Sequence, residues 1–126
     1  MKIEIENKEL LLKDLCGRLP YGVKCEVYDR IGVLDEISSY GAAVNYNSGE
    51  DTTCRIEYVK PYLFPLSSMT EEQTEELLKL INTGQNDNNE FMRSLCRIEF
   101  YHKYHFDYRD LIPKGLAKDA TGLNIY

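Results

Sequence analysis

The 126-residue sequence contains no tryptophan, only two histidines and no long apolar run. A membrane-spanning helix needs about 20 consecutive apolar residues, so no membrane span is predicted. The N-terminal segment alternates charged and apolar residues, and it therefore lacks the unbroken apolar core of a secretory signal. These absences predict a cytoplasmic protein, and the length predicts a single domain over residues 1–126.

Positive charge is also scarce. The chain has 15 Lys and Arg residues against 21 Asp and Glu residues, a net charge of −6. Nucleic-acid phosphates are bound chiefly through Lys and Arg, so this balance argues against nucleic acid as a partner. The sequence also lacks a serine nucleophile elbow, a P-loop and a dinucleotide-binding glycine pattern. The enzyme classes built on those motifs are not expected.

Four cysteines, Cys16, Cys25, Cys54 and Cys96, are spread along the chain. They form no Cys-x-x-Cys pair and no Cys/His cluster with zinc-ligand spacing. We therefore expect all four to be small, buried apolar side chains, and we expect neither a structural metal nor a cofactor.

Apolar periodicity and capping residues predict three helices, within residues 7–20, 70–83 and 88–105. In the first helix Leu11, Leu12 and Leu15 share one side, and Gly17 is expected to end it. The second helix is capped by Thr70 or Ser68, and either choice leaves an acid or amide three residues on, the spacing of a capping box.

Between the first two helices, alternating patterns predict short strands within residues 22–29, 30–38, 41–47 and 52–59. The first of these strands places Val23, Cys25 and Val27 on one face. The fold class is therefore α+β: a three- or four-stranded antiparallel sheet with three helices, mainly covering one face. The third helix is expected to bury Phe91, Leu95 and Ile98 against the sheet.

Phe100 lies on the opposite side of that third helix from Phe91, so the helix is apolar on two sides. We expect the C-terminal tail to fold back over Phe100 and Tyr104, because its segments "LIPKGLA" and "LNIY" are apolar. Deleting residues 111–126 is then predicted to prevent folding.

Both histidines lie in the segment "FYHKYHFDYRDLI". On a helical wheel His102 and His105 fall within about 40° of Phe91, so they continue the apolar stripe. Packing against the body of the protein is the favoured interpretation. The alternative is a small metal-dependent or acid–base hydrolase that uses His102, His105 and Asp107. The pair lacks the His-Glu-x-x-His arrangement of a metalloprotease, so a non-enzymatic role is favoured.

The ten tyrosines are the most unusual feature of the composition. Tyrosine suits half-buried and interface positions because it joins a large apolar ring to a polar tip. We expect the chain to be a small accessory or regulatory module that binds an unidentified protein partner, with a homodimer left open. Four aromatic residues in connector or loop settings are the expected contacts: Tyr62, Phe64, Tyr104 and Tyr108.

Three blocks of sequence carry a resemblance to known proteins: "LLLKDLCGRLPYGVK", "KPYLFPLSSMTEEQ" and "YHKYHFDYRDLIPKGLAKDATGLNIY". Together they resemble a family of small uncharacterised proteins from Bacteroides-type gut bacteria and their phages or mobile elements. The blocks span somewhat under half of the chain. The resemblance implies the bacterial cytoplasm and a setting rich in small accessory and regulatory proteins. It implies no catalytic residue.

Overall fold

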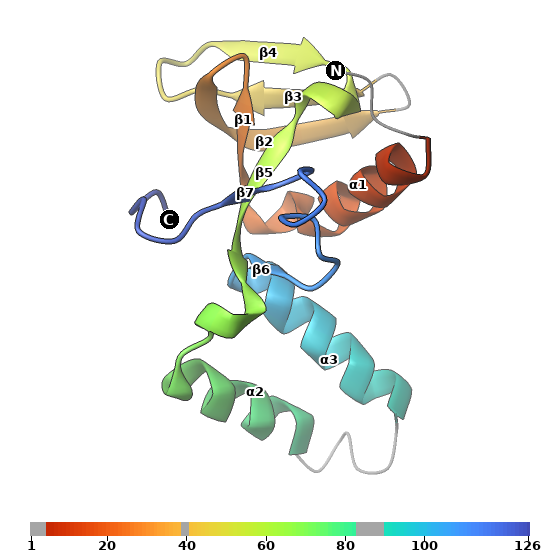
Figure 1. Cartoon of the computed structure of the whole chain (residues 1–126), viewed down its shortest axis with the longest axis vertical. Helices are drawn as coiled ribbons and strands as arrows, with labels where there is room; N and C mark the ends of the chain where they lie inside the picture. Colours follow the sequence, from red (N-terminus) through yellow and green to blue (C-terminus); the bar gives the residue numbers. More distant parts are fainter. Residues whose placement is uncertain (1–4, 39–40, 83–89) are drawn as a thin grey trace.

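The computed structural model describes residues 5–38, 41–82 and 90–126. Its elements are arranged along one long axis, with strands at one end and a pair of helices at the other (Figure 1). The helices are α1 (Ile5–Arg18), α2 (Glu71–Asn82) and α3 (Glu90–Lys103). The strands are β1 (Lys24–Val27), β2 (Arg30–Ser38), β3 (Gly41–Asn45), β4 (Asp51–Cys54), β5 (Lys60–Pro65), β6 (Phe106–Asp107) and β7 (Lys118–Asp119).

Strands β1 to β4 form the antiparallel meander that alternation predicts, in the order β4-β3-β2-β1. The sheet then continues through β5 to β6, and β7 also pairs with β5. Among the described residues the sheet thus has seven strands, and the prediction of three or four is wrong. The added strands come from the proline-flanked connector and from two-residue segments of the tail, which are too short to show alternation.

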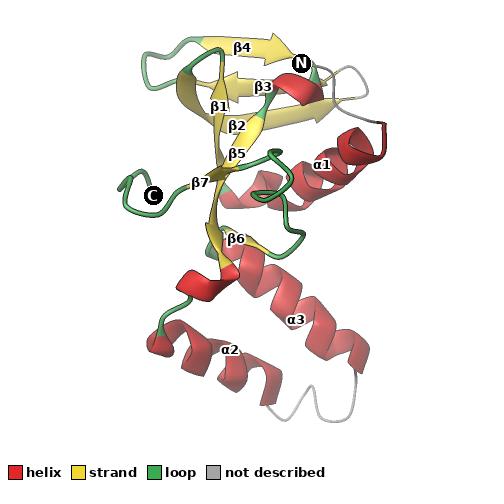
Figure 2. Cartoon of the chain, in the orientation of Figure 1, coloured by secondary structure: helices red, strands yellow, loops and turns green. Residues whose placement is uncertain are grey.

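The predicted helices begin and end close to where they were expected. A capping box opens α2: Gln73 N–H donates to Thr70 Oγ1 at 3.1 Å, and Thr70 N–H donates to Gln73 Oε1 at 2.9 Å. The first helix ends at Arg18, one residue beyond Gly17. Figure 2 shows that α2 and α3 form a hairpin of helices at the end of the molecule opposite the sheet.

The hydrophobic core lies between α1 and the sheet. Leu11 and Leu15 from α1 are buried in one cluster with Val23, Cys25 and Val27. These last three lie two residues apart, and all are fully enclosed, so the period-two pattern identified the inward face of β1 correctly. Of the three helices, α1 is the one that covers this face of the sheet.

Helix α3 does not cross the sheet, and this corrects the prediction. Phe91 is 73% exposed, and Leu95 and Ile98 are each 37% exposed. The helix contacts α2, β6 and α1, and it buries Phe100 and His102 near its C-terminal end instead. Its N-terminal turns extend beyond the body of the protein, so the stripe that contains Phe91 has no part of the sheet to cover it (Figure 1).

This placement changes the expected cost of shortening a leucine. Leu15→Ala is expected to lower the free energy of unfolding by about 2–5 kcal/mol, because Leu15 is fully buried. Leu95→Ala is expected to lower it by less than about 1 kcal/mol, because Leu95 is already partly in solvent. Chemical denaturation of both variants measures the difference. Equal losses would show that α3 packs on the core after all.

The C-terminal tail is docked on the body through buried Leu111, Leu116, Ala117 and Ala120, whereas the prediction placed it over Phe100 and Tyr104. It runs along β5, where Ala120 N–H donates to the Leu63 carbonyl at 2.8 Å. The ring that stacks on Phe100 belongs to Phe106, however, with centroids 6.3 Å apart. Residues 111–126 therefore lie along β5, and the ring that stacks on Phe100 comes from β6 at the start of the tail.

The cysteines divide into two groups. Cys25 and Cys54 are buried, as predicted, but Cys16 is exposed and Cys96 is half-buried. Cys16 lies on α1 and outside the buried stripe of Leu11 and Leu15.

Within the part of the chain that the structure describes, no helix is both long enough and apolar enough to cross a membrane.

Candidate functional site

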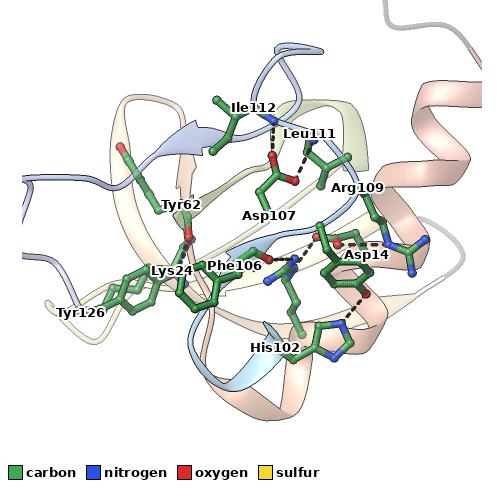
Figure 3. A network of polar contacts seen from close by, with 12 residues as sticks. Asp14, Lys24, Tyr62, His102, Phe106, Asp107, Arg109, Leu111, Ile112 and Tyr126 are labelled. Carbon is green, nitrogen blue, oxygen red and sulfur yellow. Dashed lines mark hydrogen bonds and ion pairs between the residues drawn. The ribbon is translucent and has the colours of Figure 1, made fainter. Parts of the chain in front are cut away.

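The most buried polar side chains lie where α1 meets β6. Asp14 and Arg18 are one turn apart on α1, and neither side chain is exposed. Arg18 Nε donates to Asp14 Oδ2 at 2.7 Å, and Arg18 Nη2 donates to the Phe106 carbonyl at 2.6 Å. Figure 3 shows this network of polar contacts in a close-up view. Because both contacts are charge-assisted and enclosed, they fix α1 to the start of the tail.

A second arginine joins the network from the tail. Arg109 Nε lies 3.4 Å from Asp14 Oδ1, and both guanidinium groups lie over the Tyr108 ring, at 5.4 Å for Arg18 and 5.1 Å for Arg109. Burial raises the pKa of Asp14, and the neighbouring guanidinium groups oppose that rise. The cluster holds together segments that are far apart in the sequence.

His102 packs directly against α1. A Cβ atom at Gly17 would lie 2.6 Å from His102 Cε1, so only glycine permits this close approach. His102 Nε2 forms a 2.7 Å hydrogen bond with the Tyr108 hydroxyl. Gly17 therefore makes room for the imidazole instead of ending the helix.

His105 has left the helix, with φ at 62°. Its carbonyl accepts the N–H of Phe64 at 2.8 Å, which places the start of β6 beside β5. Its ring stacks on Tyr126 with centroids 3.7 Å apart and planes 14° apart. The Tyr126 hydroxyl accepts the Lys24 N–H at 2.8 Å and donates to the Tyr62 carbonyl at 2.7 Å. This side chain thus bridges the backbones of β1 and β5.

Asp107 forms hydrogen bonds with the backbone of the tail. Its two carboxylate oxygens accept the N–H groups of Leu111 and Ile112, each at 2.9 Å (Figure 3). His102, His105 and Asp107 thus take part in three separate packing contacts. Within residues 5–38, 41–82 and 90–126, no group of three or more His, Cys, Asp or Glu side chains is placed to hold a metal ion.

Burial lowers the pKa of both imidazoles to about 4, and nearby Arg18 adds to the effect. An unfolded histidine has a pKa near 6.5, so the folded state binds fewer protons below that pH. Stability is therefore expected to fall as pH drops from about 6.5 towards 4. His102→Gln should reduce this slope, measured by urea unfolding at several pH values. The raised pKa of Asp14 makes stability change with pH in the opposite direction, so the slope of His102→Gln is compared with that of the wild type. Identical slopes in the two proteins would contradict the lowered pKa of His102.

A groove with a volume of about 490 Å³ lies beside His105, whose side chain is part of its wall. Its walls are formed by side chains from β5, from residues 68–73 at the start of α2, from residues 103–106 and from the tail. Its lining residues are Phe64, Ser68, Thr70, Gln73, Lys103, Tyr104, His105, Phe106, Thr121, Gly122 and Tyr126. We call this hollow the aromatic groove.

Contacts with neighbouring side chains hold the aromatic rings of the groove in place. The Tyr104 hydroxyl donates to Glu76 Oε1 at 2.8 Å, and Lys103 Nζ lies 3.6 Å from Glu76 Oε2. Phe64 lies between Phe106 and Tyr126, with centroid distances of 6.5 and 5.9 Å. A surface of pre-positioned aromatic rings loses little side-chain entropy when it binds a ligand.

The four predicted partner contacts do not lie together. Phe64 and Tyr104 line the aromatic groove, whereas Tyr108 belongs to the arginine network. Tyr62 is only 5% exposed, so the expectation that it is available to a partner is wrong. It lies on the central strand β5, and its hydroxyl donates to Glu26 Oε2 at 3.2 Å.

Sequence reasoning missed Asp14, Arg18 and Tyr126. A signal for the first two was available, since both fall on the same side of α1 as Leu11 and Leu15. An acid and a base one turn apart on an apolar stripe indicate a buried ion pair. No pattern marks Tyr126, whose role depends on contacts with residues distant in the sequence.

The comparisons with known proteins add no family to this description. Neither a family model, nor a curated protein, nor a solved structure matches the chain.

Proposed function

We propose that the chain is a small accessory or regulatory module that acts by binding another protein, and that the aromatic groove is its contact surface. The observation that supports this best is the convergence of aromatic rings from three separate segments on one hollow: β5, residues 104–106 and the C-terminal residue Tyr126. Aromatic residues are enriched where proteins bind one another, because each ring offers a large contact area. The resemblance to proteins of Bacteroides-type bacteria and their phages suggests a phage or mobile element as the setting.

The chemistry of the groove favours a short extended peptide. The groove is lined by aromatic rings and by the polar side chains of Ser68, Thr70, Gln73 and Thr121. The side-chain oxygens of Thr70 and Gln73 accept backbone N–H groups at the start of α2, so these two residues would act towards a ligand as donors. The rings can receive an apolar side chain while the polar groups bond to the backbone of a bound peptide. Both imidazoles are largely desolvated: His105 lines the groove, and His102 packs against Gly17 on α1. This burial suits binding better than acid–base catalysis.

Selection from a random peptide library on the immobilised protein tests this proposal. Selected peptides should bind the wild type and lose about tenfold or more in affinity with Thr121→Arg, since this change fills the groove from an exposed position. Thr53→Arg is the matched control, because Thr53 is an exposed threonine on the distant strand β4. Fluorescence anisotropy gives the dissociation constants. Equal weakening by both variants, or no selected peptide at all, would refute the proposal.

A further inference from the structure

A second hollow lies at the other end of β5, where the β1–β2 turn meets the short helix η2 (Ile56–Tyr58). Its volume is about 270 Å³. Its lining residues are Glu26, Tyr28, Asp29, Glu57, Tyr58 and Lys60. It shares no residue with the aromatic groove. We call it the tyrosine cleft.

Two exposed tyrosines form the walls of this cleft. Tyr28 is 62% exposed and Tyr58 is 50% exposed, and their ring centroids are 6.1 Å apart with planes at 36°. The faces of aromatic rings carry partial negative charge and attract cations within about 6 Å. Two rings this close together can both contact one planar cation.

The backbone of Tyr28 adds an independent observation. Tyr28 and Asp29 are the two central residues of the hairpin turn, with φ values of 51° and 63°. Turns with two positive φ values favour Asn-Gly, whereas a bulky residue such as tyrosine is strained there. A tyrosine that is exposed, strained and paired with a second ring is better explained by binding than by stability.

The charges on the cleft favour a cation. Three carboxylates and one ammonium group line it. Lys118 lies 3.2 Å from Glu26, and Lys8 lies 3.5 Å from Glu57, so two of the carboxylates are already partly neutralised. Asp29 has no ion-pair partner among the residues that the structure describes, and it lines the cleft together with Tyr28. A ligand that supplied a positive charge would complete this arrangement.

We propose that the tyrosine cleft binds an arginine side chain of a partner protein. A guanidinium group is planar, stacks on tyrosine and forms paired hydrogen bonds with a carboxylate, whereas an ammonium group cannot stack in this way. The chain itself contains this pairing at Arg30, which lies 3.8 Å over the Tyr46 ring. Arg30 is held there beside Glu50 and Ser48, so it does not fill the cleft. The proposal does not depend on the aromatic groove.

Titration of the ¹⁵N-labelled protein with the peptide Gly-Arg-Gly, followed by NMR, tests this inference. The amides of Tyr28, Asp29 and Tyr58 should shift saturably. Gly-citrulline-Gly, which has nearly the same shape without the charge, should bind at least about fivefold more weakly. Equal binding of the two peptides, or shifts confined to other residues, would overturn the assignment.

Three variants sharpen the test. Asp29→Asn keeps a residue that tolerates positive φ and removes the charge, so it should weaken Gly-Arg-Gly binding at least about fivefold without unfolding the turn. Tyr28→Asn should weaken binding similarly while raising the melting temperature, because it relieves the strained turn. Tyr21→Leu is the matched control, since Tyr21 is 38% exposed beside His102 and should leave binding unchanged. Unaltered binding in the first two variants would contradict the proposal.

Discussion

An Arg18→Met variant is expected to lose about 3–5 kcal/mol of unfolding free energy. The change leaves the Asp14 carboxylate buried with only Arg109 nearby, at 3.4 Å, and it leaves the Phe106 carbonyl without its 2.6 Å donor. Breaking a buried ion pair on one side costs more than removing both partners, because the remaining charge stays desolvated. Urea unfolding at pH 7 measures the loss.

The double variant Asp14→Leu/Arg18→Met is the matched control. It removes both members of the pair and substitutes apolar side chains of similar volume, so it should recover most of the stability lost by the single variant. A single variant as stable as the wild type would show that the Asp14–Arg18 contact does not fix α1 to β6.

Deletion of residues 111–126 is expected to abolish the cooperative unfolding transition. The segment supplies β7 and four buried apolar side chains, of which Leu111 and Leu116 are 0% and 3% exposed. Losing one buried leucine typically costs about 2–5 kcal/mol, and a small domain has only about 5–15 kcal/mol in total. The deletion also removes both amides that Asp107 caps. Circular dichroism melts of the truncated and complete chains give the comparison.

Lys114→Ala in the complete chain is the control, because Lys114 lies in the same segment but is exposed. The Lys114→Ala variant should melt like the wild type. That result would show that the effect of the deletion comes from the loss of the buried residues. A truncated chain with an unchanged melting curve would contradict the docking of the tail.

Local patterns identified the elements that depend on local chemistry. The capping box at Thr70 and Gln73, the alternation through Val23 to Val27 and the helical stripe of Leu11 and Leu15 all formed as expected. Each of these patterns reports interactions between residues close in the chain or the face of one element.

The tertiary placement of α3 could not be obtained in the same way. A helical wheel shows that Phe91 and Phe100 lie on opposite sides, but it does not show which side meets the body of the protein. His102 shares its side with Phe91 and is nevertheless buried, because only this end of α3 reaches Gly17 on α1. Burial thus depends on position along the helix as well as on angle.

Strand β5 illustrates a second limit. Because Pro61 and Pro65 lack N–H donors, the segment between them was expected to be an extended connector. In the structure, however, backbone groups of this segment pair with other strands. Phe64 donates to the His105 carbonyl, and Leu63 accepts the N–H of Ala120. These partners lie about 40 or more residues away in the sequence, so no local pattern reveals them. The aromatic groove forms around these pairings, and of the four aromatic residues expected at a partner contact only Phe64 and Tyr104 line it.

The location of a selected peptide on the ¹⁵N-labelled protein is the most direct test of the account. We predict that the largest amide shifts occur in residues 104–106 and 121–126, two of the segments that line the groove, and that Thr121→Arg removes them. The largest shifts around Phe91, Leu95 and Ile98 on the open side of α3 would contradict the account.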